Sequence, residues 1–141
     1  MLKGMPPEIS PDLMYALMSM GHGDEIVIAD GNFPADTNAQ RLIRADGLDV
    51  CTILKAVVQF FPLDTFAEDN AVIMEVADPN APKPDIWDEF KEILSMAEGK
   101  NVKLTPIERF SFYDRANEAY CVVATSEKKV YANIILKKGV V

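Results

Sequence analysis

The sequence predicts an α/β domain of three layers, in which a largely parallel sheet is covered by helices on both faces. Segments with helical periodicity alternate with short apolar runs rich in β-branched residues, which is the order typical of βαβ units. The apolar runs are continuous rather than alternating, as expected for strands buried on both faces. A chain of 141 residues, 49% of them hydrophobic, suits one domain over residues 1–141.

The first helix is predicted from its cap. Ser10 is a natural N-cap, Pro11 suits the first helical position, and the charge of Asp12 complements the helix dipole. Gly21 is expected to end the helix. One apolar face recurs at helical spacing, formed by Leu13, Ala16, Leu17 and Met20. A strand is then expected over 26–29, followed by a loop over 31–34 because Gly, Asn and Pro disfavour regular structure.

The remaining elements follow from the same signals. In chain order they are a helix over 50–61 capped by Asp49 and closed by Pro62, a strand over 71–76, a helix over 85–97 ended by Gly99, a short strand over 102–104, a helix over 108–119, and strands over 120–124 and 131–136. This pattern predicts the class of fold and leaves the order of the strands open.

The composition excludes several classes of partner. A net charge of −8 argues against a nucleic acid or an anionic membrane as a partner, because both attract clustered Lys and Arg. No apolar run approaches the ~20 residues that cross a bilayer, and residues 1–10 lack the apolar core of a signal peptide. Cys51 and Cys121 lie far apart in apolar runs and are expected to be buried free thiols. These features predict a cytoplasmic protein.

The chain has one histidine, and its setting makes it a candidate for proton transfer. His22 lies between Gly21 and Gly23, directly after the predicted helix. Two flanking glycines free the backbone and leave the ring accessible, and imidazole is the side chain whose charge changes near neutral pH. The alternative is a structural histidine, which is the commoner role for a solitary one.

Asp30 ends the predicted strand over 26–29. In doubly wound sheets ligands bind outside the carboxyl ends of the strands, so the position suits a binding carboxylate. The alternative is a turn-forming Asp bonded to the backbone of Gly31 or Asn32. A strand rises ~3.3 Å per residue, so His22 and Asp30 are expected to lie well apart. One site that uses both needs a folded-back loop or a second subunit.

Arg109 precedes an aromatic run. It is a candidate for sugar binding, or it pairs in solvent with Glu108 or Asp114. The aromatic run itself suggests a stacking surface, but Phe110 and Phe112 are expected in the core instead.

Tyr131 and Asn133 lie two residues apart on the last predicted strand and are therefore expected on one face. A phenol and an amide on one face suit the recognition of hydroxyl groups, although such pairs also occur on ordinary half-exposed strands. The sequence contains no phosphate-binding glycine loop, no dinucleotide fingerprint and no His/Cys cluster, so neither a cofactor nor a metal is expected.

Taken together, these motifs resemble the fucose-mutarotase/ribose-pyranase family over nearly the whole chain. The matching pieces, in order, are LKG at 2–4, SP at 10–11, MGHGDE at 20–25, AD at 29–30, NFPA at 32–35, IRADG at 43–47, RF at 109–110, FY at 112–113, RA at 115–116, YAN at 131–133 and LKKGV at 136–140. The segment at 20–25, joined to the Asp-x-Asn-Phe-Pro motif, is specific to the family.

The resemblance implies an isomerase that interconverts ring forms of a free monosaccharide through the open-chain aldehyde, without a cofactor. It assigns His22 as the catalytic proton donor. It assigns Asp30, Arg109, Tyr131, Ala132 and Asn133 to sugar binding. The resemblance also implies a ring-shaped homo-oligomer, often a decamer in this family, with sites near subunit contacts.

Two branches of the family compete. Ribose pyranases carry His at the position of Arg109, so Arg109 followed by Phe110 favours the fucose branch and the interconversion of L-fucose anomers. Ala132 stands where the fucose branch frequently has Gly, and Ala is also found in the ribose branch. D-ribose pyranase activity and a non-catalytic sugar-binding protein are the alternatives.

Overall fold

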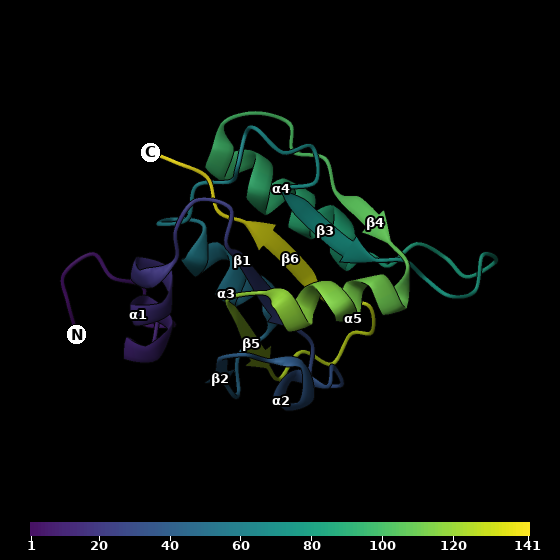
Figure 1. Cartoon of the computed structure of the whole chain (residues 1–141), viewed down its shortest axis with the longest axis horizontal. Coiled ribbons are helices and arrows are strands. Elements are labelled where there is room, and N and C mark those ends of the chain that lie inside the picture. Colours follow the sequence, from purple (N-terminus) through teal and green to yellow (C-terminus); the bar gives the residue numbers. More distant parts are fainter.

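The centre of the molecule is a six-stranded sheet. The structure, a computed structural model, describes all 141 residues. Its strands are β1 (Glu25–Ala29), β2 (Leu42–Ala45), β3 (Ala71–Met74), β4 (Thr105–Ile107), β5 (Cys121–Thr125) and β6 (Ile134–Lys137). They are arranged in the order β2-β5-β1-β6-β3-β4 (Figure 1). β6 runs antiparallel to both of its neighbours, β1 and β3, whereas the other three pairings are parallel. The predicted α/β class with a largely parallel sheet is confirmed.

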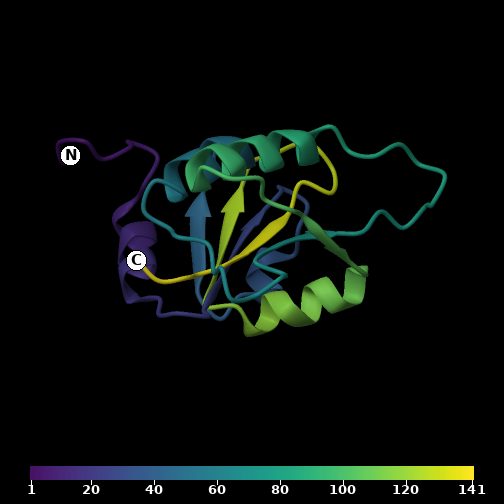
Figure 2. The same cartoon turned by 90° about the horizontal axis from the view of Figure 1, so that it is seen from above.

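Helices cover both faces of this sheet. They are α1 (Pro11–Ser19), α2 (Ala35–Asn38), α3 (Val50–Val57), α4 (Ile86–Glu98) and α5 (Arg109–Glu118). Figure 2 shows the sheet lying between α4 on one side and α5 on the other. None of the helices is both long and apolar enough to span a bilayer.

The central strands contribute side chains to two separate cores, because successive side chains point to opposite faces. In β1, Ile26 and Ile28 join the core beneath α1, α3 and α4. Val27 and Ala29 join a smaller core beneath α2 and α5. This division explains the continuous apolar runs in the sequence. Cys51 and Cys121 are buried free thiols, as predicted, and burial raises the pKa of each to about 12.

Most of the predicted helix ends are confirmed. Ser10 Oγ accepts a hydrogen bond from Leu13 N at 3.1 Å, and Asp49 Oδ1 accepts one from Thr52 N at 2.7 Å. Gly99 ends α4 in the left-handed conformation, with φ 67°. The prediction for Gly21 was wrong. α1 already ends at Ser19, because the next residue adopts an extended backbone.

Several element bounds differ from prediction. The helix predicted over 50–61 ends at Val57, and the strand predicted over 102–104 lies at 105–107. The strand predicted over 131–136 begins only at Ile134, because Tyr131 has a left-handed backbone that no strand accommodates. The helix α2 and the strand β2 were not predicted. Both are only four residues long and carry little periodicity.

Candidate functional site

Asp30 is the centre of a buried hydrogen-bond network at the carboxyl end of β1. Its side chain is only 5% exposed. Oδ1 accepts a hydrogen bond from Asn32 N at 3.0 Å, and Oδ2 accepts from Asn133 Nδ2 at 3.0 Å and Ala132 N at 3.3 Å. The backbone N–H of Asp30 donates to Asn133 Oδ1 at 2.8 Å. Asp30 therefore forms the turn contact with the Asn32 backbone and also stands at the strand end where ligand binding was expected, so the two alternatives are compatible.

Sheet register brings Asp30 and Asn133 together. In the antiparallel pair of β1 and β6, Ile28 lies opposite Ile134. Continuing that register places Asp30 opposite Ala132, where the chain enters β6. Residues more than 100 positions apart in sequence thus meet because β6 is inserted beside β1 with reversed direction.

Two opposing effects act on the Asp30 carboxyl. Burial raises its pKa, and the hydrogen bonds from Asn32, Ala132 and Asn133 act in the opposite direction because they favour the ionised form. The donors hold both oxygens in one orientation.

A pocket of about 280 Å³ opens next to Asp30. It is lined by Asp30, Asn32, Phe33, Met74, Arg109, Tyr113, Val130, Tyr131 and Asn133. A few converging polar groups between apolar walls are typical of a small-molecule site. Four of the five residues predicted to bind sugar, Asp30, Arg109, Tyr131 and Asn133, therefore share one pocket. The fifth, Ala132, contributes through its N–H to Asp30.

The loop between β5 and β6 is held close to this pocket by Gly31. Its N–H donates to Glu127 O at 2.9 Å. A Cβ at residue 31 would lie 3.0 Å from that carbonyl oxygen, so a larger residue would push the loop away. Glycine is needed here for close approach rather than for an unusual φ.

Arg109 is the first residue of α5 and is exposed. Its Nε donates to Tyr113 Oη at 3.1 Å, and its guanidinium lies 5.4 Å from the centre of the Tyr113 ring. It forms no ion pair. Glu108, the alternative partner, instead caps α5 by accepting from Phe110 N and from the following N–H. The guanidinium is thus available to a ligand in the pocket.

The aromatic run divides between core and surface. Phe112 is fully buried, as predicted, but Phe110 is 67% exposed, so its predicted place in the core was wrong. The reason is helical geometry: residues two positions apart lie on different faces of α5.

Tyr131 lines the pocket because of a left-handed turn before β6, which was not predicted from the sequence. It lies before β6, so its grouping with Asn133 does not arise from strand alternation, and that reasoning was wrong. Its backbone has φ 55°. Its carbonyl accepts a hydrogen bond from Trp87 Nε1 at 3.0 Å, and its Oη accepts from Ala77 N at 3.3 Å. Trp87 was not identified from sequence, although it is the only tryptophan.

His22 lies beyond the amino end of β1, because it precedes that strand, whereas Asp30 follows its carboxyl end. Its Nε2 lies 3.3 Å from Asp64 Oδ1, and its ring centre lies 5.9 Å from that of Phe66. The imidazole is 47% exposed. Gly23 has φ 87°, in agreement with the expected backbone freedom next to the ring. The expected separation of His22 and Asp30 is confirmed.

Asp64 is buried and was missed in the sequence. A hydrogen bond from Phe66 N lowers the pKa of its carboxyl, and the contact with His22 acts in the same direction. The Asn70 side chain donates to Asp64 O at 2.7 Å, which closes the segment 64–70 on itself. No local motif marks this aspartate, because its partner lies 42 residues earlier.

A cluster of four charges anchors the same segment. Arg115 of α5 donates to Glu25 through Nε and Nη2, with the shortest distance 2.7 Å, and its Nη1 donates to Asp69 at 2.7 Å. Lys137 lies 3.5 Å from Glu25 and 3.6 Å from Asp69. The cluster joins α5, β1 and β6 to the segment that carries Asp64.

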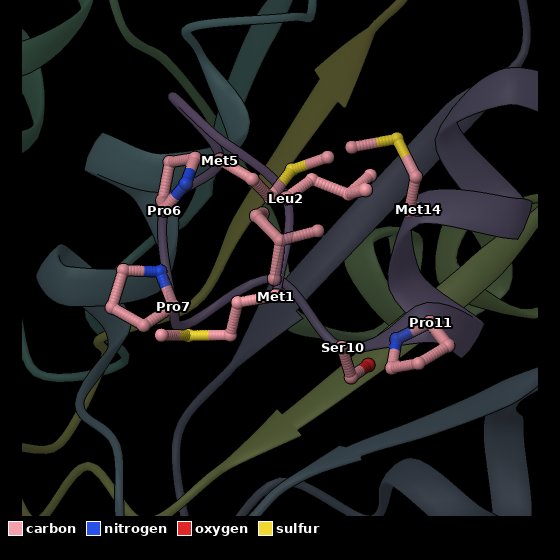
Figure 3. Close-up of a pocket in the computed structure, with 9 residues that line it drawn as sticks. Met1, Leu2, Met5, Pro6, Pro7, Ser10, Pro11 and Met14 are labelled. Carbon is pink, nitrogen blue, oxygen red and sulfur yellow. The ribbon is translucent and has the colours of Figure 1, made fainter.

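A larger apolar pocket lies elsewhere, between the N-terminal segment and α1. It has a volume of about 520 Å³. Its lining consists of methionine, leucine, isoleucine and proline side chains with one serine hydroxyl, Ser10, most of them labelled in Figure 3. It contains no ionisable side chain and none of the predicted site residues. Nowhere in the structure do three or more His, Cys, Asp or Glu side chains group as they would around a metal ion.

Comparison with known proteins gives a consistent result. The sequence model of the family described as the RbsD/FucU transport protein family matches residues 3–141. The chain is 48% identical to a fucose mutarotase of Homo sapiens, over 99% of this chain and 94% of the relative. Its fold is similar to the crystal structure of the fucose mutarotase in complex with L-fucose from Streptococcus pneumoniae, with a TM-score of 0.94, 43% identity and 99% coverage of both chains. Bacillus subtilis RbsD complexed with D-ribose shares the fold at 21% identity, with a TM-score of 0.73 over 100% of this chain and 99% of that one.

Proposed function

Because this chain belongs to the RbsD/FucU family, we propose that it is an L-fucose mutarotase in which the Asp30 pocket holds the sugar and His22 donates the proton. It is an isomerase that acts on sugar anomers, and the whole chain, residues 1–141, forms the catalytic domain. The observation that carries the proposal is the convergence of Asp30, Arg109, Tyr131 and Asn133 in one small pocket.

The chemistry of the pocket suits the hydroxyl groups of a monosaccharide. The Asp30 carboxylate, which lines the pocket, accepts from a sugar hydroxyl, and the amide of Asn133 is held beside it. Arg109 is free to donate to an oxygen of the substrate or to stabilise charge that develops on it. Phe33 and Met74 form apolar walls that suit the carbon face of a sugar.

Mutarotation requires two proton movements that leave the total unchanged. The anomeric hydroxyl loses a proton and the ring oxygen gains one, so the C1–O5 bond breaks and the open aldehyde forms. Rotation about C1–C2 and reclosure, with the proton movements reversed, deliver the other anomer. A positioned acid typically contributes 10²–10⁴-fold to such a step. In this proposal His22 donates a proton to the ring oxygen, solvent water takes the proton from the anomeric hydroxyl, and Asp64 holds the imidazole in place.

A second copy of the chain completes the site. His22 and Asp30 lie at opposite ends of β1. In this proposal His22 of a neighbouring protomer therefore approaches the Asp30 pocket. We call the surroundings of His22 and the Asp30 pocket the two half-sites. Each has an exposed aromatic side chain beside it: Phe66, 79% exposed, next to His22, and Phe110, 67% exposed, next to Arg109. Exposed aromatics of this kind are enriched in protein interfaces. We propose a ring-shaped homo-oligomer, a decamer, with each site at a subunit contact.

The fucose branch is favoured over the ribose branch by Arg109, which replaces the histidine of ribose pyranases. The likeness to Bacillus subtilis RbsD supports only a common fold. A cytoplasmic location is supported by the two buried free thiols, which suit a reducing compartment.

The activity is tested by NMR magnetisation exchange between the anomers of L-fucose, with D-ribose measured in parallel. An enzyme accelerates exchange at substoichiometric concentration and leaves the anomer ratio unchanged. A binding protein shifts the ratio in proportion to its own concentration. Faster exchange for ribose than for fucose would reassign the substrate.

The shared site is tested by complementation between two inactive variants. His22→Ala and Asp30→Ala are each expected to be inactive. When they are co-expressed, random assembly gives about a quarter of sites with His22 from one protomer and Asp30 from the other, so activity returns. If both residues acted within one protomer, the mixture would stay inactive.

A further inference from the structure

Tyr131 is the only non-glycine residue with a positive φ, at 55°. L-residues avoid this conformation because Cβ crowds the backbone carbonyl. Such outliers persist only where the surrounding structure holds them, and they cluster at functional sites. Here the outlier lines the sugar pocket, so the groups that maintain it determine the shape of the pocket.

Contacts from two other elements hold Tyr131. The indole Nε1–H of Trp87 donates to its carbonyl oxygen at 3.0 Å. On its side chain, Oη accepts a hydrogen bond from Ala77 N at 3.3 Å. Immediately afterwards, the N–H of Ala132 donates to Asp30. The turn is therefore fixed from α4, from the segment after β3 and from the binding carboxylate itself.

Trp87 is well placed to fix this turn because it lies in the first turn of α4. The helix is anchored by Ile86 and Phe90, which are buried in the larger core. The indole is itself partly buried and packs against that core. Trp87 does not line the sugar pocket and reaches it only through Tyr131.

We propose that Trp87 is a positioning residue for the sugar pocket, whose indole N–H maintains the left-handed turn that presents Tyr131 and Asn133 to the substrate. The inference rests on the proposed function for the identity of the sugar. The hydrogen bond itself, and its link to the pocket, do not depend on the reaction.

Loss of this hydrogen bond affects binding more than chemistry. Trp87 makes no contact with His22, and Tyr131 and Asn133 are proposed to bind the substrate in its ground state and its transition state alike. Removal of such uniform binding raises KM and leaves kcat nearly unchanged. One lost hydrogen bond of about 1 kcal/mol corresponds to a rise in KM of about fivefold.

The first experiment measures anomer exchange as a function of L-fucose concentration for Trp87→Phe, which keeps an aromatic ring and loses the N–H donor. The expected result is a KM raised about fivefold with kcat within about twofold of wild type. Tyr15→Phe is the matched control, because Tyr15 is an exposed aromatic on α1 with no part in either half-site, and its KM is expected to stay unchanged. A folded Trp87→Phe variant with unchanged KM overturns the proposal.

The second experiment needs no variant and uses the single indole as a spectroscopic probe. In the ¹⁵N-labelled wild-type protein, the one indole N–H resonance is expected to shift saturably with L-fucose and not with a sugar alcohol that the pocket does not bind. If Trp87→Phe fails to fold, this measurement decides, and an indole resonance that does not move at saturating fucose overturns the proposal. Wild-type protein that shifts the indole resonance without accelerating exchange contradicts the proposed enzyme activity and supports the positioning role.

Discussion

The two ends of β1 are built in opposite ways. At the carboxyl end, Asp30 is buried and both its oxygens and its N–H are hydrogen-bonded. At the amino end, His22 is about half exposed and makes one polar contact, to Asp64 at 3.3 Å. The proposed sugar-binding end is therefore preorganised by a rigid network, whereas the proposed proton donor is accessible to a group that approaches from outside the protomer.

The electrostatics of the two ends differ as well. Asp30 is a single charge held by neutral donors from Asn32, Ala132 and Asn133. Near His22, chain segments are held together by ion pairs, in which Arg115 binds Glu25 and Asp69. Neutral donors preserve the orientation of one carboxylate, whereas the ion pairs hold together chain segments that are distant in sequence. At the exposed end, activity and stability are therefore expected to depend on different residues, whereas at the buried end one substitution is expected to affect both.

The largest expected effect is on activity at the exposed end. His22→Ala is expected to slow L-fucose anomer exchange by about 100- to 10,000-fold, because it removes the proposed acid. The free energy of unfolding and the affinity for fucose are expected to change little, since the ring is half exposed. Exchange NMR and urea denaturation measure the two quantities. Exchange at the wild-type rate in this variant would show that His22 is not the proton donor.

The next effect is on stability. Arg115→Met is expected to lower the free energy of unfolding by about 3 kcal/mol, because it leaves Glu25 without its guanidinium partner in a largely buried setting. Arg44→Met is the control: the Arg44–Asp46 pair is exposed and local, and its removal is expected to have no measurable effect. Equal effects of the two substitutions in urea denaturation would contradict the structural role of the cluster.

At the buried end, one substitution is expected to affect both properties. Asn133→Ala leaves the N–H of Asp30 and one carboxylate oxygen without their amide partner, at a cost of about 2 kcal/mol in unfolding free energy. KM for fucose is expected to rise at the same time. If stability fell while KM stayed the same, the amide would have a structural role alone.

The smallest effects are in pH dependence, and they have opposite signs. Burial raises the pKa of Asp30 above its ordinary 3.8, so the native state binds this proton more tightly, and the stability it contributes is lost as pH rises through the native value. The hydrogen bond from Phe66 lowers the pKa of Asp64 below 3.8, so its contribution is present above that value and is lost as pH falls through the native one.

Both contributions to stability are measured from the unfolding free energies of wild type, Asp30→Asn and Asp64→Asn between about pH 2.5 and 7. Relative to wild type, Asp30→Asn is expected to gain stability as pH rises from about 3.8. Asp64→Asn is expected to approach wild type as pH falls below that value. The same direction of change in both variants would contradict the contrast between the two ends.

The parts of the molecule that were predicted correctly depend on local signals. The caps at Ser10 and Asp49 and the left-handed stop at Gly99 were recognisable because each acts within a few residues of its own position. The place of Asp30 at the end of a buried strand was also predictable, because it directly follows an apolar run; its role in binding stays a prediction. Asp64 and Trp87 were not, since each acts on a partner more than 40 residues away and carries no local motif.

The amino-acid sequence alone determined the α/β class, the family resemblance and the residue types of the two half-sites, because helical period, strand composition and capping all act over short distances. Only the tertiary structure decided that β6 lies reversed between β1 and β3, which sets Asn133 beside Asp30. It also decided that β1 separates His22 from Asp30, so that the proposed proton donor and the proposed sugar pocket lie at opposite ends of one strand. Strand order results from the burial of many apolar side chains at once, and no single stretch of sequence encodes it.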